Sequence, residues 1–195
     1  MDTGIIILAA GDSGRLGKPK QLLTYQGKTF LEIVSDAAIE TGFKPVIVVL
    51  GAYADDILKQ QKQPGITYII NDSWMDGMSS SIGAGMSAIL GEQKDLENII
   101  IAVADQVFIT SKIFENLVEK QAETGKNIIA SGYAQTLGTP ALFNKRYFEQ
   151  LISLKGDTGA KNILMQHPDD TETIIFEQGN IDIDTEADYN NLIKD

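Results

Sequence analysis

Glycines and cationic residues are concentrated in one short stretch of an otherwise acidic chain, ILAAGDSGRLGKPKQLL (residues 7–23). Gly11 and Gly14 allow backbone conformations closed to other residues and let peptide N–H groups approach a ligand closely. Successive N–H groups turned inward form a nest that binds anions. Arg15 adds a planar fork suited to phosphate oxygens, and Lys20 adds a point charge. The stretch therefore predicts a locally built phosphate-binding loop.

The two common phosphate-binding motifs do not fit this loop. The P-loop pattern G-x-x-x-x-G-K-[ST] fails because Lys18 is followed by Pro19. The pattern G-x-G-x-x-G fails because two residues separate Gly11 from Gly14. A flexible surface turn is the alternative interpretation. Because the loop follows an apolar strand and carries clustered cations, we expect ligand binding.

Composition limits the classes of function. The chain has 195 residues, a net charge of -11, a hydrophobic share of 43% and no cysteine. This acidity argues against a nucleic-acid partner, since binding to a phosphate backbone depends on clustered Lys and Arg. No apolar run is long enough to cross a bilayer, so we expect no membrane partner and a cytoplasmic location. Without cysteine there is no thiol nucleophile or thiolate metal site.

Apolar runs alternate with stretches of helical spacing along the whole chain, which predicts an α/β fold with a largely parallel sheet. Without a linker or repeat, residues 1–195 are expected to form one domain. Ligands of such sheets bind outside the carboxyl ends of the strands. The predicted strands are 5–10, 45–51, 66–71, 98–106, 127–133 and 171–177, with an extended start at 139. The predicted helices are 29–42, 54–63, 79–90, 111–125, 158–167 and 185–195, with a further one ending at 154.

The loop resembles the signature of nucleotidyltransferases that join an NTP to a phosphorylated acceptor. The pattern L-A-A-G-x-S-x-R-x-G-x-P-K-Q-L-L is most similar to MobA-like NTP transferases of the molybdenum cofactor cytidylyltransferase branch. The resemblance implies a Rossmann-like three-layer α/β/α fold of the nucleotide-diphospho-sugar transferase type. It also implies that Arg15, Lys20 and Asp105 are catalytic. The implied nucleotide-binding residues are Leu8, Ala9, Ala10, Gly11, Ser13, Gly14, Arg15, Lys20, Gly77, Ser79 and Ser81.

The segment WMDGMSSSIGAG (74–85) resembles the part of the family in which glycine and serine groups meet the base. Ser79 is also a candidate N-cap, since its hydroxyl could accept a bond from the first turn of the helix. An N-capped helix packed closely through Gly83 and Gly85 is the alternative interpretation. The two interpretations are compatible.

The resemblance implies a magnesium site. ADQ (104–106) matches the family's strand-ending acid, so Asp105 is the predicted ligand, and Mg²⁺ would neutralise charge on the phosphates. Asp182 is the predicted second ligand. It shares one face of an extended segment with Asp184, which is the alternative ligand. Asp184 and Thr185 are both candidate N-caps of the terminal helix.

LKGDTGAKNIL (154–164) resembles the family's segment near the acceptor, which implies that Asp157 and Lys161 bind it. Asp157 is equally well interpreted as a helix cap beside a solvated lysine. Thr139 stands where the family usually has histidine, so the identity of the acceptor stays open.

The implied reaction is attack by an acceptor phosphate on the α-phosphorus of CTP, with release of pyrophosphate. The implied acceptor is molybdopterin or molybdenum cofactor, and a molybdoenzyme or its chaperone is a further partner that the resemblance suggests. Ala10 favours CTP over GTP, because its methyl group takes room that a purine needs. The alternatives are a guanylyl, sugar-phosphate or isoprenoid-precursor nucleotidyltransferase and a non-catalytic nucleotide-binding partner. A reductase is the least favoured.

Overall fold

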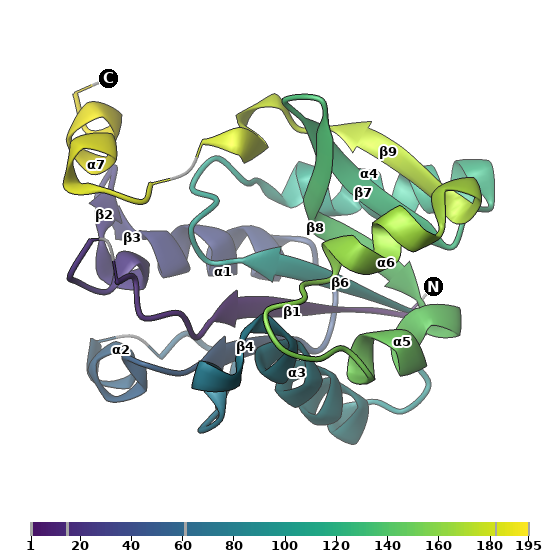
Figure 1. The fold of residues 1–195 in the computed structure, drawn as a ribbon, viewed down its shortest axis with the longest axis horizontal. Helices are drawn as coiled ribbons and strands as arrows, with labels where there is room; N and C mark the ends of the chain where they lie inside the picture. Colours follow the sequence, from purple (N-terminus) through teal and green to yellow (C-terminus); the bar gives the residue numbers. More distant parts are fainter. Residues whose placement is uncertain (1, 15, 61, 182, 195) are drawn as a thin grey trace.

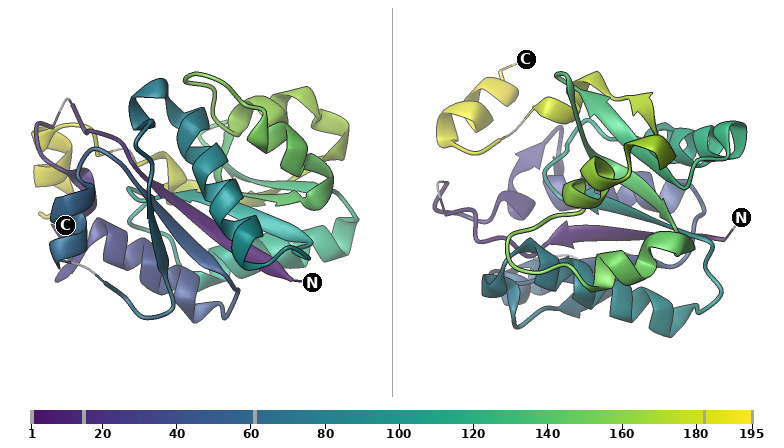
Figure 2. Two further views of the ribbon diagram at one scale, coloured as in Figure 1. Left: turned by 90° about the horizontal axis from the view of Figure 1, so that it is seen from below. Right: turned by 45° about the vertical axis from the view of Figure 1, so that its right-hand side comes forward.

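The computed structural model describes residues 2–14, 16–60, 62–181 and 183–194. In these residues a seven-stranded sheet carries helices on both faces, which confirms the predicted three-layer α/β/α fold (Figure 1, Figure 2). The strands of this sheet are β1 (Thr3–Ala9), β4 (Val46–Leu50), β5 (Thr67–Ile70), β6 (Asn98–Val103), β7 (Ile128–Tyr133), β8 (Thr136–Asn144) and β9 (Thr171–Ile175). The helices are α1 (Phe30–Glu40), α2 (Ala54–Gln60), α3 (Met78–Glu92), α4 (Ser111–Thr124), α5 (Phe148–Ile152), α6 (Lys161–Gln166) and α7 (Glu186–Leu192).

The strand order is β5-β4-β1-β6-β8-β7-β9. β1, β4, β5 and β6 are parallel, β8 is antiparallel to both of its neighbours, and β9 is parallel to β7. The chain extends the sheet from β1 through β4 to β5 and then returns to place β6 on the other side of β1. This reversal makes the carboxyl ends of β1 and β6 the place where a ligand of an open α/β sheet is expected.

The unbroken apolar run of β1 is explained by burial on both faces of the sheet. Ile5 and Ile7 pack into the cluster that also contains side chains of α1, α2 and α4. Ile6 and Leu8 point to the opposite face and pack into the cluster with α3, α5 and α6. The alternation of a strand thus divides one apolar sequence between two cores, which fixes where β1 ends and the loop begins.

The C-terminal helix α7 packs against the region that follows the glycine-rich loop, beside the hairpin of β2 (Thr24–Tyr25) and β3 (Lys28–Thr29) (Figure 1). The Tyr189 hydroxyl donates to the carbonyl of Thr24 at 2.9 Å, and its ring meets Phe30 edge-on. This hairpin was not predicted from the sequence. Its packing brings the chain just before α7 alongside the loop after β1.

Most predicted element ends differ from the structure by a few residues, and three of these differences concern the predicted site. β6 ends at Val103, so Asp105 lies in the turn that follows the strand. The N-cap of α3 is Gly77, so the prediction that Ser79 caps this helix is wrong. Thr185 caps α7, with Asp188 completing a capping box, which removes Asp184 as the cap. None of the described helices is both long enough and apolar enough to span a membrane.

Candidate active site

A cavity of about 520 Å³ lies at the carboxyl ends of β1 and β6. Its lining combines the end of β1 and the following loop, the start of α3, the end of β6 with the following turn, and the segment before α6. The residues predicted for the site that line this cavity are Leu8, Ala9, Ala10, Gly11, Ser13, Lys20, Gly77, Ser81, Asp105 and Asp157. Distant parts of the sequence thus meet at the place that the sheet topology favours.

Two of the predicted nucleotide-binding residues are placed outside the lining of this cavity. The N–H of Gly14 donates to the Asp12 carboxylate at 3.2 Å. The Ser79 hydroxyl donates to the carbonyl of Gly156 at 2.7 Å, which joins α3 to the segment before α6. The predicted catalytic residue Arg15 lies outside the described residues.

Backbone carbonyls of the glycine-rich loop are held by the protein. The carbonyl oxygens of residues 9–12 each accept a hydrogen bond. The side-chain amide of Gln21 donates to the first and the third of them, at 2.8 and 3.1 Å. The Ala52 N–H donates to the second at 3.1 Å, and the Tyr53 hydroxyl to the fourth at 2.7 Å. Because these carbonyls face the protein, the loop is suited to offer N–H groups to an anion.

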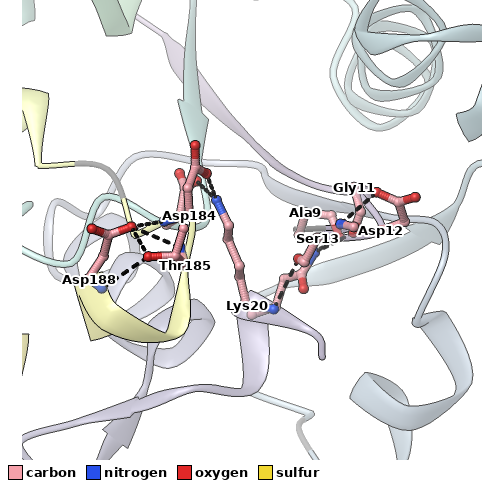
Figure 3. Close-up of polar contacts among 11 residues, drawn as sticks. Ala9, Gly11, Asp12, Ser13, Lys20, Asp184, Thr185 and Asp188 are labelled. Carbon is pink, nitrogen blue, oxygen red and sulfur yellow. Dashed lines mark hydrogen bonds and ion pairs between the residues drawn. The ribbon is translucent and has the colours of Figure 1, made fainter. Parts of the chain in front are cut away.

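Ser13 closes the loop and directs the chain toward Lys20. It adopts a positive φ of 52°, and its carbonyl accepts bonds from the N–H groups of Leu16 and Gly17. Its hydroxyl accepts a bond from the N–H of Lys20 at 3.1 Å. The backbone of Lys20 is therefore fixed by Ser13, and its ammonium is held at the other end by Asp184 (Figure 3).

The Lys20 ammonium lies between two carboxylates. It donates a hydrogen bond to Asp184, and Asp105 Oδ2 lies 3.7 Å away (Figure 3 labels Lys20 and Asp184). The side chain of Lys20 is 15% exposed, against 27% for Asp184 and 35% for Asp105. The two carboxylates are thus held close to one common cation.

Asp184 is held by the first turn of α7. Its N–H and that of Thr185 both donate to the Asp188 carboxylate, at 3.2 and 2.8 Å. Hydrogen bonds from Thr185, and more weakly the charge of Lys20, hold the pKa of Asp188 below its ordinary value. The capping box thus stabilises the turn that carries Asp184 toward Lys20.

The carboxylates of Asp105 and Asp184 fit a divalent cation. Mg²⁺ is usually bound through one or two carboxylates, with waters and substrate phosphates as the other ligands. Among the described residues, no three or more His, Cys, Asp or Glu side chains are placed so that they could hold a metal ion together. The predicted ligand Asp182 lies outside the described residues, whereas Asp184, the alternative ligand, lies beside Asp105 through their common partner Lys20.

The two predicted acceptor-binding residues are separated. Asp157 lines the main cavity beside Gly77. Gly77 has a φ of 97°, and it also has no room for a side chain, because a methyl group there would lie 2.5 Å from Asp157 Oδ1. Asp157 does not cap α6, since the N-cap of that helix is Ala160. Lys161 donates to the Thr136 hydroxyl at 2.7 Å and lines an adjoining cavity of about 200 Å³.

Sequence reasoning missed several residues of this cavity. Gln21 matched the family pattern but received no role, and it proves to hold two carbonyls of the loop. Trp74, Met75 and Met78 add an apolar wall, and both methionines are largely exposed. The run WMDGM was the available signal, because three large apolar side chains stand there on either side of the turn-forming Asp76 and Gly77.

The comparisons with known proteins agree with this geometry. The family model described as MobA-like NTP transferase domain matches residues 5–171. The chain belongs to the MobA-like NTP transferase family. This membership supports the general assignment as a nucleotidyltransferase. The matched residues include the glycine-rich loop, the start of α3 and Asp105, while Asp184 lies beyond the match.

Relatives of this MobA-like protein differ in the activity that their names state. It is 29% identical over 174 residues to nicotine blue oxidoreductase of Paenarthrobacter nicotinovorans, which covers 84% of this chain and 81% of that protein. It is 26% identical over 188 residues to the molybdenum cofactor cytidylyltransferase of Escherichia coli, which covers 94% of this chain and 92% of that protein. Family membership alone therefore does not identify the substrates.

A solved structure shares the fold of this MobA-like protein over its whole length. The structure of Rv0371c from Mycobacterium tuberculosis in complex with manganese has a TM-score of 0.80 at 23% identity. The alignment covers 100% of this chain and 99% of that one.

Proposed function

We propose that the protein is a divalent-metal-dependent cytidylyltransferase that transfers CMP from CTP to a phosphorylated acceptor, with molybdopterin or molybdenum cofactor as the acceptor. The observation that carries this proposal is the position of Lys20 between Asp105 and Asp184 at the edge of a cavity with a glycine-rich loop. Transfer of a nucleotidyl group requires countercharge around a triphosphate. A chain of net charge -11 supplies it only locally.

In the proposed reaction an acceptor phosphate oxygen forms a bond to the α-phosphorus of CTP, and the bond from that phosphorus to the pyrophosphate oxygen breaks. The phosphate is already ionised at neutral pH, so no strong general base is needed. Positioning and charge neutralisation carry the rate of such transfers. The N–H groups of the loop and Lys20 would hold the phosphates, and Arg15 is the proposed second cation. Mg²⁺ held by Asp105 and Asp184 would supply further countercharge.

The choice of CTP rests on Ala10. This residue lines the cavity, and a methyl group at Gly51 would meet its Cβ at 2.8 Å and its carbonyl at 2.5 Å, so Ala10 has no room to retreat from a larger base. One methyl group typically discriminates by about 1–3 kcal/mol. The nucleotide preference we propose is therefore moderate, and GTP is the competing substrate.

The choice of acceptor rests on the match to a molybdenum cofactor cytidylyltransferase over 94% of the chain. A molybdoenzyme or its chaperone would then be the recipient of the product. The manganese complex of a protein with the same fold supports a divalent metal, and Mg²⁺ is our proposal for the ion used. Sugar-phosphate and isoprenoid-precursor acceptors remain the alternatives within the same chemistry.

A second candidate is an oxidoreductase, because one relative is named nicotine blue oxidoreductase. Hydride transfer requires no lysine held between two carboxylates, so this arrangement favours the transferase. The test is incubation with Mg²⁺, each NTP in turn and each class of acceptor, with pyrophosphate measured. Parallel incubations measure oxidation of NADH and NADPH.

We expect pyrophosphate with CTP and a molybdopterin-type acceptor, and none when Asp105→Asn replaces the native protein. Turnover of NADH or NADPH without pyrophosphate from any NTP would support the oxidoreductase instead.

A further inference from the structure

Asn71, which directly follows β5, bonds to the first turn of α3 and to the chain just before Trp74. Its side-chain nitrogen lies 2.8 Å from the Ser80 hydroxyl and 3.0 Å from the Ser81 hydroxyl, both in the first turn of α3. Its side-chain oxygen accepts a bond from the backbone N–H of Ser73 at 3.0 Å. Asn71 is only 7% exposed, so water does not compete strongly for these bonds.

The bond to Ser73 fixes the orientation of the Asn71 amide. A backbone N–H only donates, so it must face the oxygen of the amide and not its NH₂ group. Both hydrogens of the NH₂ group are then directed at Ser80 and Ser81. The two serine hydroxyls therefore accept from Asn71, and each must direct its own hydrogen elsewhere.

The hydrogens of the two hydroxyls have different destinations. The single hydroxyl hydrogen of Ser80 is shared between the carbonyls of Ser73 and Gly77, whose oxygens each lie 2.8 Å from its Oγ. For Ser81, the described residues include no acceptor for the hydroxyl hydrogen. Ser81 is 5% exposed and lines the cavity. A buried donor without a partner is unfavourable, so a bound ligand gains by supplying an acceptor there.

We propose that Asn71 is a positioning residue for nucleotide selection: it fixes Ser81 as a hydrogen-bond donor to the base. This inference rests on the proposed function, and it specifies which kind of base atom can bind opposite Ser81. The base atom opposite Ser81 must be an acceptor, such as a ring carbonyl oxygen or an unprotonated ring nitrogen. Cytosine presents two such atoms side by side, O2 and N3, whereas an amino group at that place would leave the hydroxyl hydrogen of Ser81 without an acceptor.

The test compares binding of CTP with binding of inorganic tripolyphosphate, both with Mg²⁺, by isothermal titration calorimetry. Tripolyphosphate lacks a base, so the ratio of the two dissociation constants isolates recognition of the nucleoside. Ser81→Ala removes the donor. Asn71→Asp keeps the size of the side chain but leaves only acceptor atoms, so both serine hydroxyls turn their hydrogens toward it.

We expect each of these two variants to weaken CTP relative to tripolyphosphate by about tenfold. The effects should not add in the double variant, because Asn71 acts through Ser81. Ser80→Ala is the matched control: it removes a hydroxyl with the same partner, but Ser80 does not line the cavity. Its ratio should stay within about twofold of the native value.

An unchanged ratio in Ser81→Ala, or an equal change in Ser80→Ala, would overturn the inference while leaving the proposed function intact. Should Asn71→Asp fail to fold, Ser81→Ala and its control still decide whether Ser81 reads the base. A native protein that binds tripolyphosphate but no NTP contradicts the proposed function itself, and the inference falls with it.

Discussion

Replacing Lys20 by methionine is predicted to tighten the binding of a divalent cation while abolishing nucleotidyl transfer. The Lys20 ammonium lies between Asp105 and Asp184, the two carboxylates that would hold the metal. Its positive charge therefore occupies the position where the metal ion would bind. In the proposed site, a metal binding without nucleotide would have to compete with this ammonium. With nucleotide bound, the phosphates would attract Lys20 away from the carboxylates.

The size of the effect follows from the geometry. An ion pair at the observed 3.7 Å between Lys20 and Asp105 has an energy of about 4 kcal/mol at an effective dielectric constant of about 20, and about 1 kcal/mol in water. Asp105 is 35% exposed, so solvent screens the pair and the lower part of this range applies. Losing about 1.4 kcal/mol of competition corresponds to about tenfold tighter metal binding.

The assay is a titration of nucleotide-free protein with Mn²⁺. Binding is measured by calorimetry or by the electron paramagnetic resonance signal of free Mn²⁺. Lys18→Met is the matched control, because it changes the net charge equally but touches neither Asp105 nor Asp184. It removes an exposed pair with Glu186 at 3.1 Å and a cation–π contact with the Tyr189 ring, whose centroid lies 5.6 Å away. We expect tighter Mn²⁺ binding in Lys20→Met alone. Equal affinity in Lys20→Met and native protein, or equal tightening in Lys18→Met, would refute the reasoning.

Two further predictions concern hydrogen bonds that are buried or partly buried in the structure. Gln21→Met keeps the volume of the side chain but removes both donors to the loop carbonyls, so the KM for CTP should rise about tenfold with a smaller change in kcat; unchanged steady-state kinetics would contradict this role. Tyr147→Phe should destabilise the fold by about 1–3 kcal/mol at neutral pH in urea unfolding, because the Tyr147 hydroxyl donates to Asp170 at 2.7 Å. Burial alone would raise the pKa of Asp170, but bonds from Tyr147 and Asn127 outweigh it and lower that pKa below 3.8. Stability from a lowered pKa is present above the unfolded value and disappears as the pH falls through the folded one, so the difference between Tyr147→Phe and native protein should narrow below about pH 4.

The sequence predicted the parallel half of the fold well, because short-range signals dominate there. The apolar run of β1 and the glycines after it mark a buried strand and a loop without reference to distant residues. Thr29 and Glu32 form the capping box that begins α1 close to the predicted start. The antiparallel direction of β8 was not predictable in this way. It depends on a tight turn at Ala134 and Gln135, which both adopt positive φ although neither is a usual turn residue.

The candidate site was predicted in part. Lys20 and Asp105 could be recognised because a motif and a strand end mark them, and the structure brings them to one cavity. The partner of Asp105 could not be chosen from sequence, because alternation gives Asp182 and Asp184 the same face. The packing of α7 on the hairpin of β2 and β3 brings Asp184 to Lys20, and that packing is a long-range property.

The most direct test of the account is a crystal structure of the protein with a non-hydrolysable CTP analogue and Mn²⁺, with the metal located by its anomalous scattering. The account predicts a Mn²⁺ peak in contact with Asp105 and Asp184, the triphosphate along residues 9–14, and the Lys20 ammonium on phosphate oxygens. A Mn²⁺ ion bound away from both carboxylates, or a triphosphate that avoids the loop, would contradict it.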